Sequence, residues 1–313
     1  MGCKRLKKIE TVSLVGLGAI GATYGSLLHD SLKESFRIVA SEQRINKYKK
    51  NGININDKKY EFNYITPETV VEPVDLVVFA VKNAELPQAM RDVKYHIGPN
   101  TIILSLLNGI SSEETIYEEF HNDHILYSMS VEIDALRTNF DVRFTTRGRI
   151  EFGESNNSLS HDVLAVKDLF DRVGIDYKIS ENITHTMWWK FMINVGVNQT
   201  SAVLKAPYGI FQSLPSAYEW MESAMREVVA ISERVGTGLT EEDVKKFWPI
   251  VNNLSPKGKT SMLQDVEAGR KTEVEYFAGK VCELGEKYGV PTPINEQLYK
   301  VIRIIEEMDK LNN

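Results

Sequence analysis

The segment Gly16–Gly21 most constrains what this chain can fold into. It lies between the apolar run Thr11–Val15 and the amphipathic stretch Ala22–Leu28. An apolar strand that turns through glycines into a helix brings unpaired backbone N–H groups and the positive helix end to one point, which suits a pyrophosphate. The strand before it and the helix after it favour a dinucleotide site over a structural turn. The expected cofactor contacts are Gly16, Leu17, Gly18, Ala19, Ile20 and Gly21.

The first half of the chain alternates short apolar runs with polar or amphipathic segments. Four runs are predicted to be strands buried on both faces: Thr11–Val15, Phe36–Ala40, Asp75–Val81 and Thr101–Leu107. Such strands imply a parallel sheet covered by helices, and so an α/β fold. Ile125–Val131 predicts one more strand. Phe144–Thr146 and Ile150–Phe152 predict a hairpin that extends the sheet in antiparallel fashion, and a helix is expected from about Leu159 to Val173.

Helical periodicity dominates the second half, where strand-like runs almost vanish. The predicted helices are Ile183–Ala202, Pro215–Val235, Glu241–Asn253, Lys259–Tyr288 and Asn295–Leu311. We place a domain boundary near Ser180. The prediction is a dinucleotide-binding α/β domain over residues 1–180 and an all-α substrate and catalytic domain over residues 181–313.

Composition excludes several classes of function. The chain has 313 residues, 42% of them apolar, which is enough for about two domains with separate cores. A net charge of -6 argues against nucleic acid as a partner, and no segment approaches the roughly 20 apolar residues of a membrane span. Cys3 and Cys282 suggest neither a disulfide framework nor a metal site, so we expect a cytoplasmic protein without a bound metal.

Two polar pairs follow predicted strands at the edge where the glycine-rich segment lies. Lys82-Asn83 follows Asp75–Val81, and Asn108-Gly109 follows Thr101–Leu107. Ligands of open α/β sheets bind beyond the carboxyl ends of the strands. Each pair is therefore either a solvated turn or part of the ligand site.

Lys190, Asn194 and Asn198 lie at i, i+4 and i+8 in an otherwise apolar segment. This spacing stacks one cation and two amides along a single helix face. Apolar and aromatic neighbours disfavour the charged form of a lysine, which readies it to donate a proton. The alternative is a polar stripe facing water, with Trp188 and Trp189 packed in the core.

Ser261 and Glu273 are predicted to lie on one long helix. Twelve residues of ideal helix rotate them about 120° apart, so they meet one ligand only if it lies across the helix or the helix bends near Gly269. From the pattern alone, Glu273 is one of many solvated carboxylates.

Together these segments resemble the 2-dehydropantoate 2-reductases, also called ketopantoate reductases. The matching motifs are the glycine-rich segment, Val81-Lys82, Asn108-Gly109, Trp189-Lys190 with Asn194 and Asn198, Ser261–Asp265, Gly269-Arg270 and Thr272-Glu273. The matches cover nearly the whole chain. The resemblance implies a Rossmann-type domain followed by a helical domain, with the active site between them. It also implies reduction of the 2-keto group of ketopantoate to pantoate, for pantothenate synthesis, by a nicotinamide cofactor.

The resemblance also assigns roles to individual residues. It makes Lys190 the general acid and Glu273 a carboxylate that supports catalysis and contacts substrate and cofactor. Lys82 is expected beside the nicotinamide and the substrate. The remaining expected contacts to substrate or cofactor are Asn108, Asn194, Asn198 and Ser261.

Two features leave alternatives open. Glu42 follows the second strand, where a carboxylate accepts the ribose hydroxyls of NAD and repels a 2′-phosphate, although Ser41, Arg44 or Lys47 could hold that phosphate. NADPH is expected from the resemblance, with NAD not excluded. The stretches 132–137 and 139–143 diverge from the small-residue, glycine-bearing version that is typical of the family. The alternatives are a reductase of another 2-oxo acid and a non-catalytic dinucleotide-binding redox sensor, and a homodimer is compatible with exposed apolar faces on the C-terminal helices.

Overall fold

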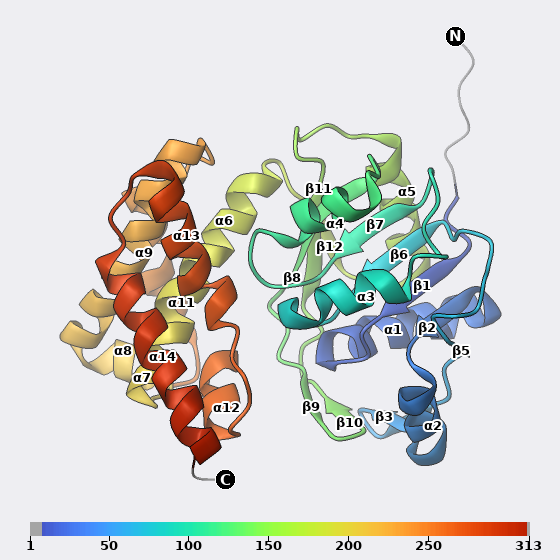
Figure 1. The fold of residues 1–313 in the computed structure, drawn as a ribbon, viewed down its shortest axis with the longest axis horizontal. Coiled ribbons are helices and arrows are strands. Elements are labelled where there is room, and N and C mark those ends of the chain that lie inside the picture. Colours follow the sequence, from blue (N-terminus) through green and yellow to red (C-terminus); the bar gives the residue numbers. More distant parts are fainter. Residues whose placement is uncertain (1–7, 312–313) are drawn as a thin grey trace. The chain divides into compact units, whose positions relative to one another are not determined.

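The protein is described by a computed structural model that covers residues 8–311. The chain divides into two compact units, the first ending at Ile183 and the second beginning at Thr184 (Figure 1). Cys3 lies outside the described residues. Cys282 is a free thiol.

The first unit is built on an eight-stranded sheet with the order β12-β11-β8-β7-β6-β1-β2-β5. Its strands are β1 (Val12–Val15), β2 (Phe36–Val39), β5 (Tyr64–Ile65), β6 (Leu76–Phe79), β7 (Ile102–Ser105), β8 (Ile125–Val131), β11 (Arg149–Gly153) and β12 (Tyr177–Ile179). The strands from β8 to β5 are parallel, and β11 pairs antiparallel to β8. The four predicted buried strands all lie in this parallel part, which confirms the α/β fold and its antiparallel extension.

Helices cover both faces of the sheet (Figure 1). Successive residues of a strand point to opposite faces, so each strand contributes side chains to both. Leu14 and Val78 belong to one buried cluster, which includes residues of α1 (Ala19–Leu32) and α5 (His161–Val173). Val15 and Phe79 belong to a second cluster, with residues of α3 (Leu86–Asp92) and α4 (Ser112–Phe120). Both faces are apolar, so these strands read as continuous apolar runs in the sequence.

A second, four-stranded sheet has the order β4-β3-β10-β9. Its strands are β3 (Ile53–Ile55), β4 (Lys58–Tyr60), β9 (Leu136–Thr138) and β10 (Asp141–Arg143). The predicted hairpin of Phe144–Thr146 with Ile150–Phe152 is wrong. The Asp134 carboxylate accepts hydrogen bonds from the amides of Thr145 and Thr146, at 2.9 and 2.8 Å, and takes the donors that such a hairpin would need. Strand β11 pairs with β8 instead.

Beyond Thr184 the described residues form helices and turns, which confirms the all-α second half. The helices are α6 (Ile183–Ile193), α7 (Gln199–Leu204), α8 (Gly209–Ser213), α9 (Pro215–Val235), α10 (Glu241–Lys245), α11 (Phe247–Asn253), α12 (Ser261–Glu267), α13 (Ala278–Tyr288) and α14 (Pro293–Leu311). A π-helical segment, Asn194–Asn198, joins α6 to α7.

Two of the predicted long helices are interrupted. The predicted helix Lys259–Tyr288 ends at Glu267 and resumes at Ala278. Gly269 has a φ of +61°, which a helix does not allow, and the Arg270 amide bonds back to the Asp265 carbonyl at 2.8 Å. The predicted helix Glu241–Asn253 breaks after Lys245, the residue whose carbonyl the ring of Pro249 would meet in a continuous helix.

A buried polar network holds α7, α9, α13 and α14 together. The Gln199 side chain donates to the Val195 carbonyl at 2.7 Å and accepts from the Ala278 amide at 2.9 Å. The Glu227 carboxylate of α9 accepts from the amides of Ile294 and Asn295 at the start of α14, at 2.8 and 3.0 Å. A carboxylate at a helix N-terminus is favourably placed toward the helix dipole. This network fixes the scaffold on which α6 and the π-helical segment lie.

Candidate functional site

The glycine-rich segment forms a cradle that side chains would fill. Gly16 has a φ of +98°, and a Cβ there would lie 2.4 Å from the Ala80 carbonyl oxygen. A Cβ on Gly21 would lie 2.0 Å from the Gly16 oxygen, whereas one on Gly18 would meet nothing nearer than 3.9 Å. The first and third glycines therefore allow close packing, and the second leaves the space above the loop open. Helix α1 begins at Ala19. These residues fit a dinucleotide pyrophosphate.

The loops that carry Lys82 and Asn108 are joined through Asn83. Lys82 follows β6 and opens a 3-10 turn over Asn83–Glu85, in which its carbonyl accepts from the Glu85 amide at 2.8 Å. The Asn83 side chain, 5% exposed, donates to the Asn108 carbonyl at 2.8 Å. The prediction that both loops lie at one sheet edge agrees with this contact. Sequence reasoning missed this role of Asn83, because its partner is a backbone atom in the loop after β7.

Glu42 is the first residue of α2 (Glu42–Asn51) and is exposed. Ser41 caps this helix by accepting from the Arg44 amide at 3.5 Å. The Arg44 guanidinium forms an ion pair with Glu85 at 3.2 Å. The positive charge nearest to Glu42 in sequence is thus partly compensated by a carboxylate of the 3-10 turn.

Glu113 is a buried carboxyl group in the first turn of α4, the helix that follows the Asn108 loop. Its side chain accepts from the Ser112 hydroxyl at 2.9 Å, and that hydroxyl accepts from Ser105 at 2.8 Å. Burial raises the pKa of Glu113 from its ordinary 4.5 to about 7. A carboxyl whose pKa is raised by folding destabilises the folded state progressively as pH rises through the interval between the two values.

We therefore expect Glu113→Gln to gain stability relative to the wild type as pH rises. Between pH 5 and pH 8 the difference in free energy of unfolding should change by about 2 kcal/mol in favour of the variant, since one pKa unit corresponds to about 1.4 kcal/mol. Urea unfolding at both pH values measures it. The matched control is Glu114→Gln, at the exposed neighbouring position. Equal pH dependence in wild type and Glu113→Gln would contradict the shifted titration.

In the second unit the structure brings Asn194, Asn198 and Ser261 together. The Asn198 amide nitrogen lies 3.4 Å from the Asn194 side-chain oxygen and 3.5 Å from the Ser261 hydroxyl. Ser261 is the first residue of α12, which Thr260 caps by accepting from the Leu263 amide at 3.1 Å. Lys190 lies on α6 one turn before Asn194. Trp188 is buried, and the Trp189 indole donates to the Asp243 carbonyl at 3.1 Å, so both rings are structural.

The π-helical segment satisfies its backbone with nearby side chains. A π turn breaks the ordinary helical hydrogen bonds and leaves carbonyls that need other donors. The Thr200 hydroxyl donates to the Gly196 carbonyl at 2.7 Å. The side-chain Nε2 of Gln199 donates to the Val195 carbonyl, also at 2.7 Å. A Cβ on Gly196 would lie 2.6 Å from the Met225 side chain of α9, so the segment packs closely. Segments of this kind occur frequently at functional sites.

Glu273 lies outside any long helix, in the turn between α12 and α13. Two side-chain contacts hold this turn. Arg270 donates from Nε to the Asp265 carboxylate at 2.8 Å, and Glu306 of α14 accepts from the amide and hydroxyl of Thr272 at 2.8 and 2.6 Å. The predicted 120° separation of Ser261 and Glu273 on one helix therefore does not apply.

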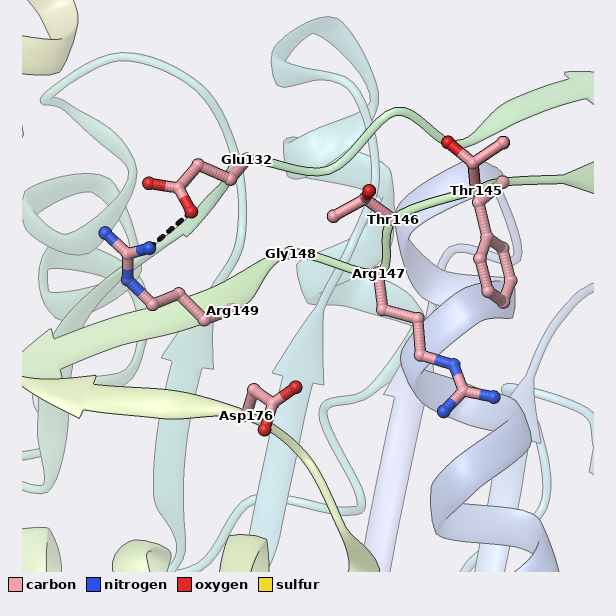
Figure 2. A pocket seen from close by; sticks show the side chains of 8 residues that line it. Glu132, Thr145, Thr146, Arg147, Gly148, Arg149 and Asp176 are labelled. Atoms are coloured by element: carbon pink, nitrogen blue, oxygen red, sulfur yellow. Dashed lines mark hydrogen bonds and ion pairs between the residues drawn. The ribbon is translucent and has the colours of Figure 1, made fainter.

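A pocket of about 640 Å³ lies where β8 ends and β11 begins. Figure 2 shows the side chains that line it. It is lined by Glu132, Phe144, Thr145, Thr146, Arg147, Gly148, Arg149 and Asp176. The Arg149 guanidinium bonds Glu132 at 2.6 Å and the buried Glu151 at 2.6 and 2.9 Å. Its charge is already compensated, and two of the lining residues are acidic. We do not assign this pocket to an acidic substrate, and it contains none of the predicted site residues.

Between residues 8 and 311, no cluster of three or more His, Cys, Asp or Glu side chains is arranged to hold a metal ion. Over the same residues, none of the helices combines the length and the apolar character needed to cross a membrane.

Two family models match the chain. The model described as ketopantoate reductase PanE/ApbA matches residues 12–157, and the model for the C-terminal part of the same family matches residues 182–306. Among similar proteins, the 2-dehydropantoate 2-reductase of Streptococcus pyogenes serotype M3 is 24% identical over 299 residues, which are 94% of this chain and 97% of that protein.

Solved structures share the fold over nearly the whole length. D-mandelate dehydrogenase, solved with NADH and anilino(oxo)acetate, has a TM-score of 0.84 at 23% identity and covers 96% of this chain and 99% of its own. A dimeric ketopantoate reductase from Staphylococcus aureus has a TM-score of 0.79 at 19% identity, with the same coverage.

Proposed function

The chain belongs to the ketopantoate reductase family, and from that premise we propose that it reduces 2-dehydropantoate (ketopantoate) to (R)-pantoate with NADPH, in pantothenate biosynthesis. The matches across both halves support oxidoreduction of this type with a nicotinamide dinucleotide. Residues 1–180 are proposed to bind the cofactor, and residues 181–313 to carry the substrate-binding and catalytic side chains. The observation that carries the proposal is the contact of Asn198 with both Asn194 and Ser261. Asn194 lies one helical turn beyond Lys190.

The chemistry of the reaction supports these roles. When bound, the nicotinamide supplies a hydride to the C2 carbonyl of the substrate. A carbonyl that accepts a hydride becomes an alkoxide, so a cation that lies nearby and then donates its proton lowers the barrier. Lys190 is proposed for this task. Asn194, Asn198 and Ser261 offer neutral donors and acceptors for the polar ends of the substrate. Asn108 and Lys82 are proposed cofactor and substrate contacts, and Glu273 a supporting carboxylate.

A reductase of another 2-oxo acid is the second candidate. The stretch 132–143, which diverges from the family pattern, forms β9, β10 and part of the pocket in Figure 2. D-mandelate dehydrogenase, solved with NADH and anilino(oxo)acetate, has the same fold and a substrate other than ketopantoate. A dinucleotide-binding redox sensor is the third candidate. A redox sensor would need the glycine-rich segment but none of Lys190, Asn194 and Asn198.

One assay separates the three candidates. We expect oxidation of NADPH by the purified protein with ketopantoate as substrate, and formation of (R)-pantoate. NADH and a small panel of branched 2-oxo acids complete the experiment. Faster turnover of another 2-oxo acid would identify that acid, and not ketopantoate, as the substrate. Binding of dinucleotide without turnover of any acid would favour the redox sensor.

The homodimer stays a prediction. Helix α14 carries an apolar stripe whose members are 36–86% exposed: Val301, Ile304, Met308 and Leu311. Such a stripe on a helix is typical of a surface that another chain covers. Sedimentation velocity at micromolar concentration would contradict the dimer if it showed monomer alone.

A further inference from the structure

Arg137 extends from the small sheet onto the glycine-rich segment. It lies on β9. Its Nη1 donates to the carbonyl of Leu17, 120 residues earlier in the chain, and its Nε donates to the Asn139 carbonyl at 2.7 Å. The guanidinium also lies over the ring of Tyr48 on α2, 5.6 Å from its centroid. These three contacts fix a cation between the glycine-rich segment and α2.

This place corresponds to the adenosine side of a dinucleotide site. In such folds the pyrophosphate binds at the N-terminus of the first helix, and the residue after the second strand faces the 2′ position of the adenosine ribose. Here the first helix begins at Ala19, and α2 follows β2 directly. A side chain that contacts both Leu17 and α2 is therefore next to the ribose position.

The charge of Arg137 is uncompensated. An arginine has five N–H donors, of which the two contacts above use two. Across residues 8–311, no carboxylate forms an ion pair with Arg137, whereas Arg44 pairs with Glu85 and Arg143 with Asp57. The planar fork of a guanidinium matches a phosphate group by paired hydrogen bonds.

We propose that Arg137 binds the 2′-phosphate of NADP(H) and sets the preference for this cofactor against the opposing charge of Glu42. The inference depends on the proposed function, because it requires a nicotinamide dinucleotide in the cradle. It explains how a chain with Glu42 at the ribose position accommodates a phosphate. The 2′-phosphate is held from the small sheet, while Arg44 remains paired with Glu85.

A purely structural role makes a different prediction. If Arg137 only links β9 to the glycine-rich segment, its removal loosens the cradle and weakens every dinucleotide equally. If it binds the 2′-phosphate, the loss is confined to ligands that carry that phosphate. Charge-assisted hydrogen bonds contribute about 1.5–3 kcal/mol, which corresponds to roughly 10–100-fold in affinity.

The experiment is calorimetric titration of wild type, Arg137→Met and Arg137→Gln with NADPH, NADH, 2′,5′-ADP and 5′-AMP. The glutamine variant retains an N–H donor at the position of Nε, whose partner is the Asn139 carbonyl, and loses the charge. We expect both variants to bind NADPH and 2′,5′-ADP at least 10-fold more weakly, with less than 3-fold change for NADH and 5′-AMP. Arg143→Met, which removes an exposed cation of the same small sheet, is the control and should match wild type. A Glu42→Gln variant should strengthen binding of NADPH more than that of NADH.

Four results would overturn the inference. Equal weakening of NADPH and NADH in Arg137→Gln would make Arg137 structural, and unchanged NADPH affinity would remove it from the site. A wild type that binds NADH as tightly as NADPH would refute the inference and leave the proposed reductase standing. A wild type that binds neither dinucleotide would refute both. Thermal unfolding without ligand checks that each variant is folded.

Discussion

Lys190→Ala should lower kcat by about 100-fold or more while the affinity for cofactor changes little. A proton donor matters most in the transition state, after negative charge has begun to form on the substrate oxygen. Removal of an interaction that forms only in the transition state lowers kcat and kcat/KM together and leaves cofactor binding unchanged. Steady-state kinetics with saturating cofactor, and titration of cofactor binding, measure both quantities.

Two further variants make the Lys190 experiment specific. Lys190→Met retains much of the aliphatic stem and should lose as much kcat as Lys190→Ala, because the ammonium group is absent in both. Lys245→Ala removes an exposed lysine of α10 whose ion pair within residues 8–311 is a surface contact with Glu242, so it should leave kcat unchanged. Turnover near the wild-type rate in Lys190→Ala would support the water-facing stripe instead.

The parts of the fold that were predictable from sequence are those fixed by local pattern. Buried strands are almost entirely apolar, so β1, β6 and β7 were recognisable without knowledge of their partners. The glycine cradle was predictable for a similar reason. Gly16 needs a positive φ and Gly21 needs the absence of a Cβ, and both demands appear directly as glycine in the sequence.

The parts that escaped prediction depend on contacts between distant residues. Strand β3 has only three residues and pairs with β10, where the Asn54 side chain donates to Asp141 at 2.9 Å across 87 positions. The sequence around either strand gives no sign of the other. The hairpin prediction failed because Asp134, ten or more residues upstream, takes the amides of Thr145 and Thr146.

The candidate site shows the same division. The spacing of Lys190, Asn194 and Asn198 was visible as a helical repeat, and the contact between the two asparagines agrees with a shared face. The π-helical segment was not visible, because it depends on Thr200 and Gln199 supplying donors to its carbonyls. The break after Glu267 was not visible either, since one glycine in a helical pattern is often tolerated. Arg137 was missed because its partner, the Leu17 carbonyl, lies in another part of the chain.

Glu273→Gln should lower kcat/KM, and its effect should be clearly less than additive with that of Lys190→Ala. The glutamine keeps the shape of the side chain and removes the carboxylate. If Glu273 accepts from the substrate hydroxyl and positions Lys190, the two groups act as a unit, so loss of either removes much of what the other contributes. The structure also removes the geometric objection to a ligand shared by Glu273 and Ser261, because these two residues do not lie on one helix.

The matched control is Glu267→Gln. Glu267 is an exposed carboxylate at the end of α12 that bonds only the surface Lys259, at 2.8 Å, among the described residues. Its loss should leave kcat/KM at the wild-type value when it is made alone, and at the value of Lys190→Ala when it is combined with that substitution. Full additivity of two large effects would show that Glu273 and Lys190 act at separate places. A Glu273→Gln variant as active as the control would return Glu273 to the solvated carboxylates, because a side chain that contacts the substrate cannot lose its charge without a change in kcat or KM.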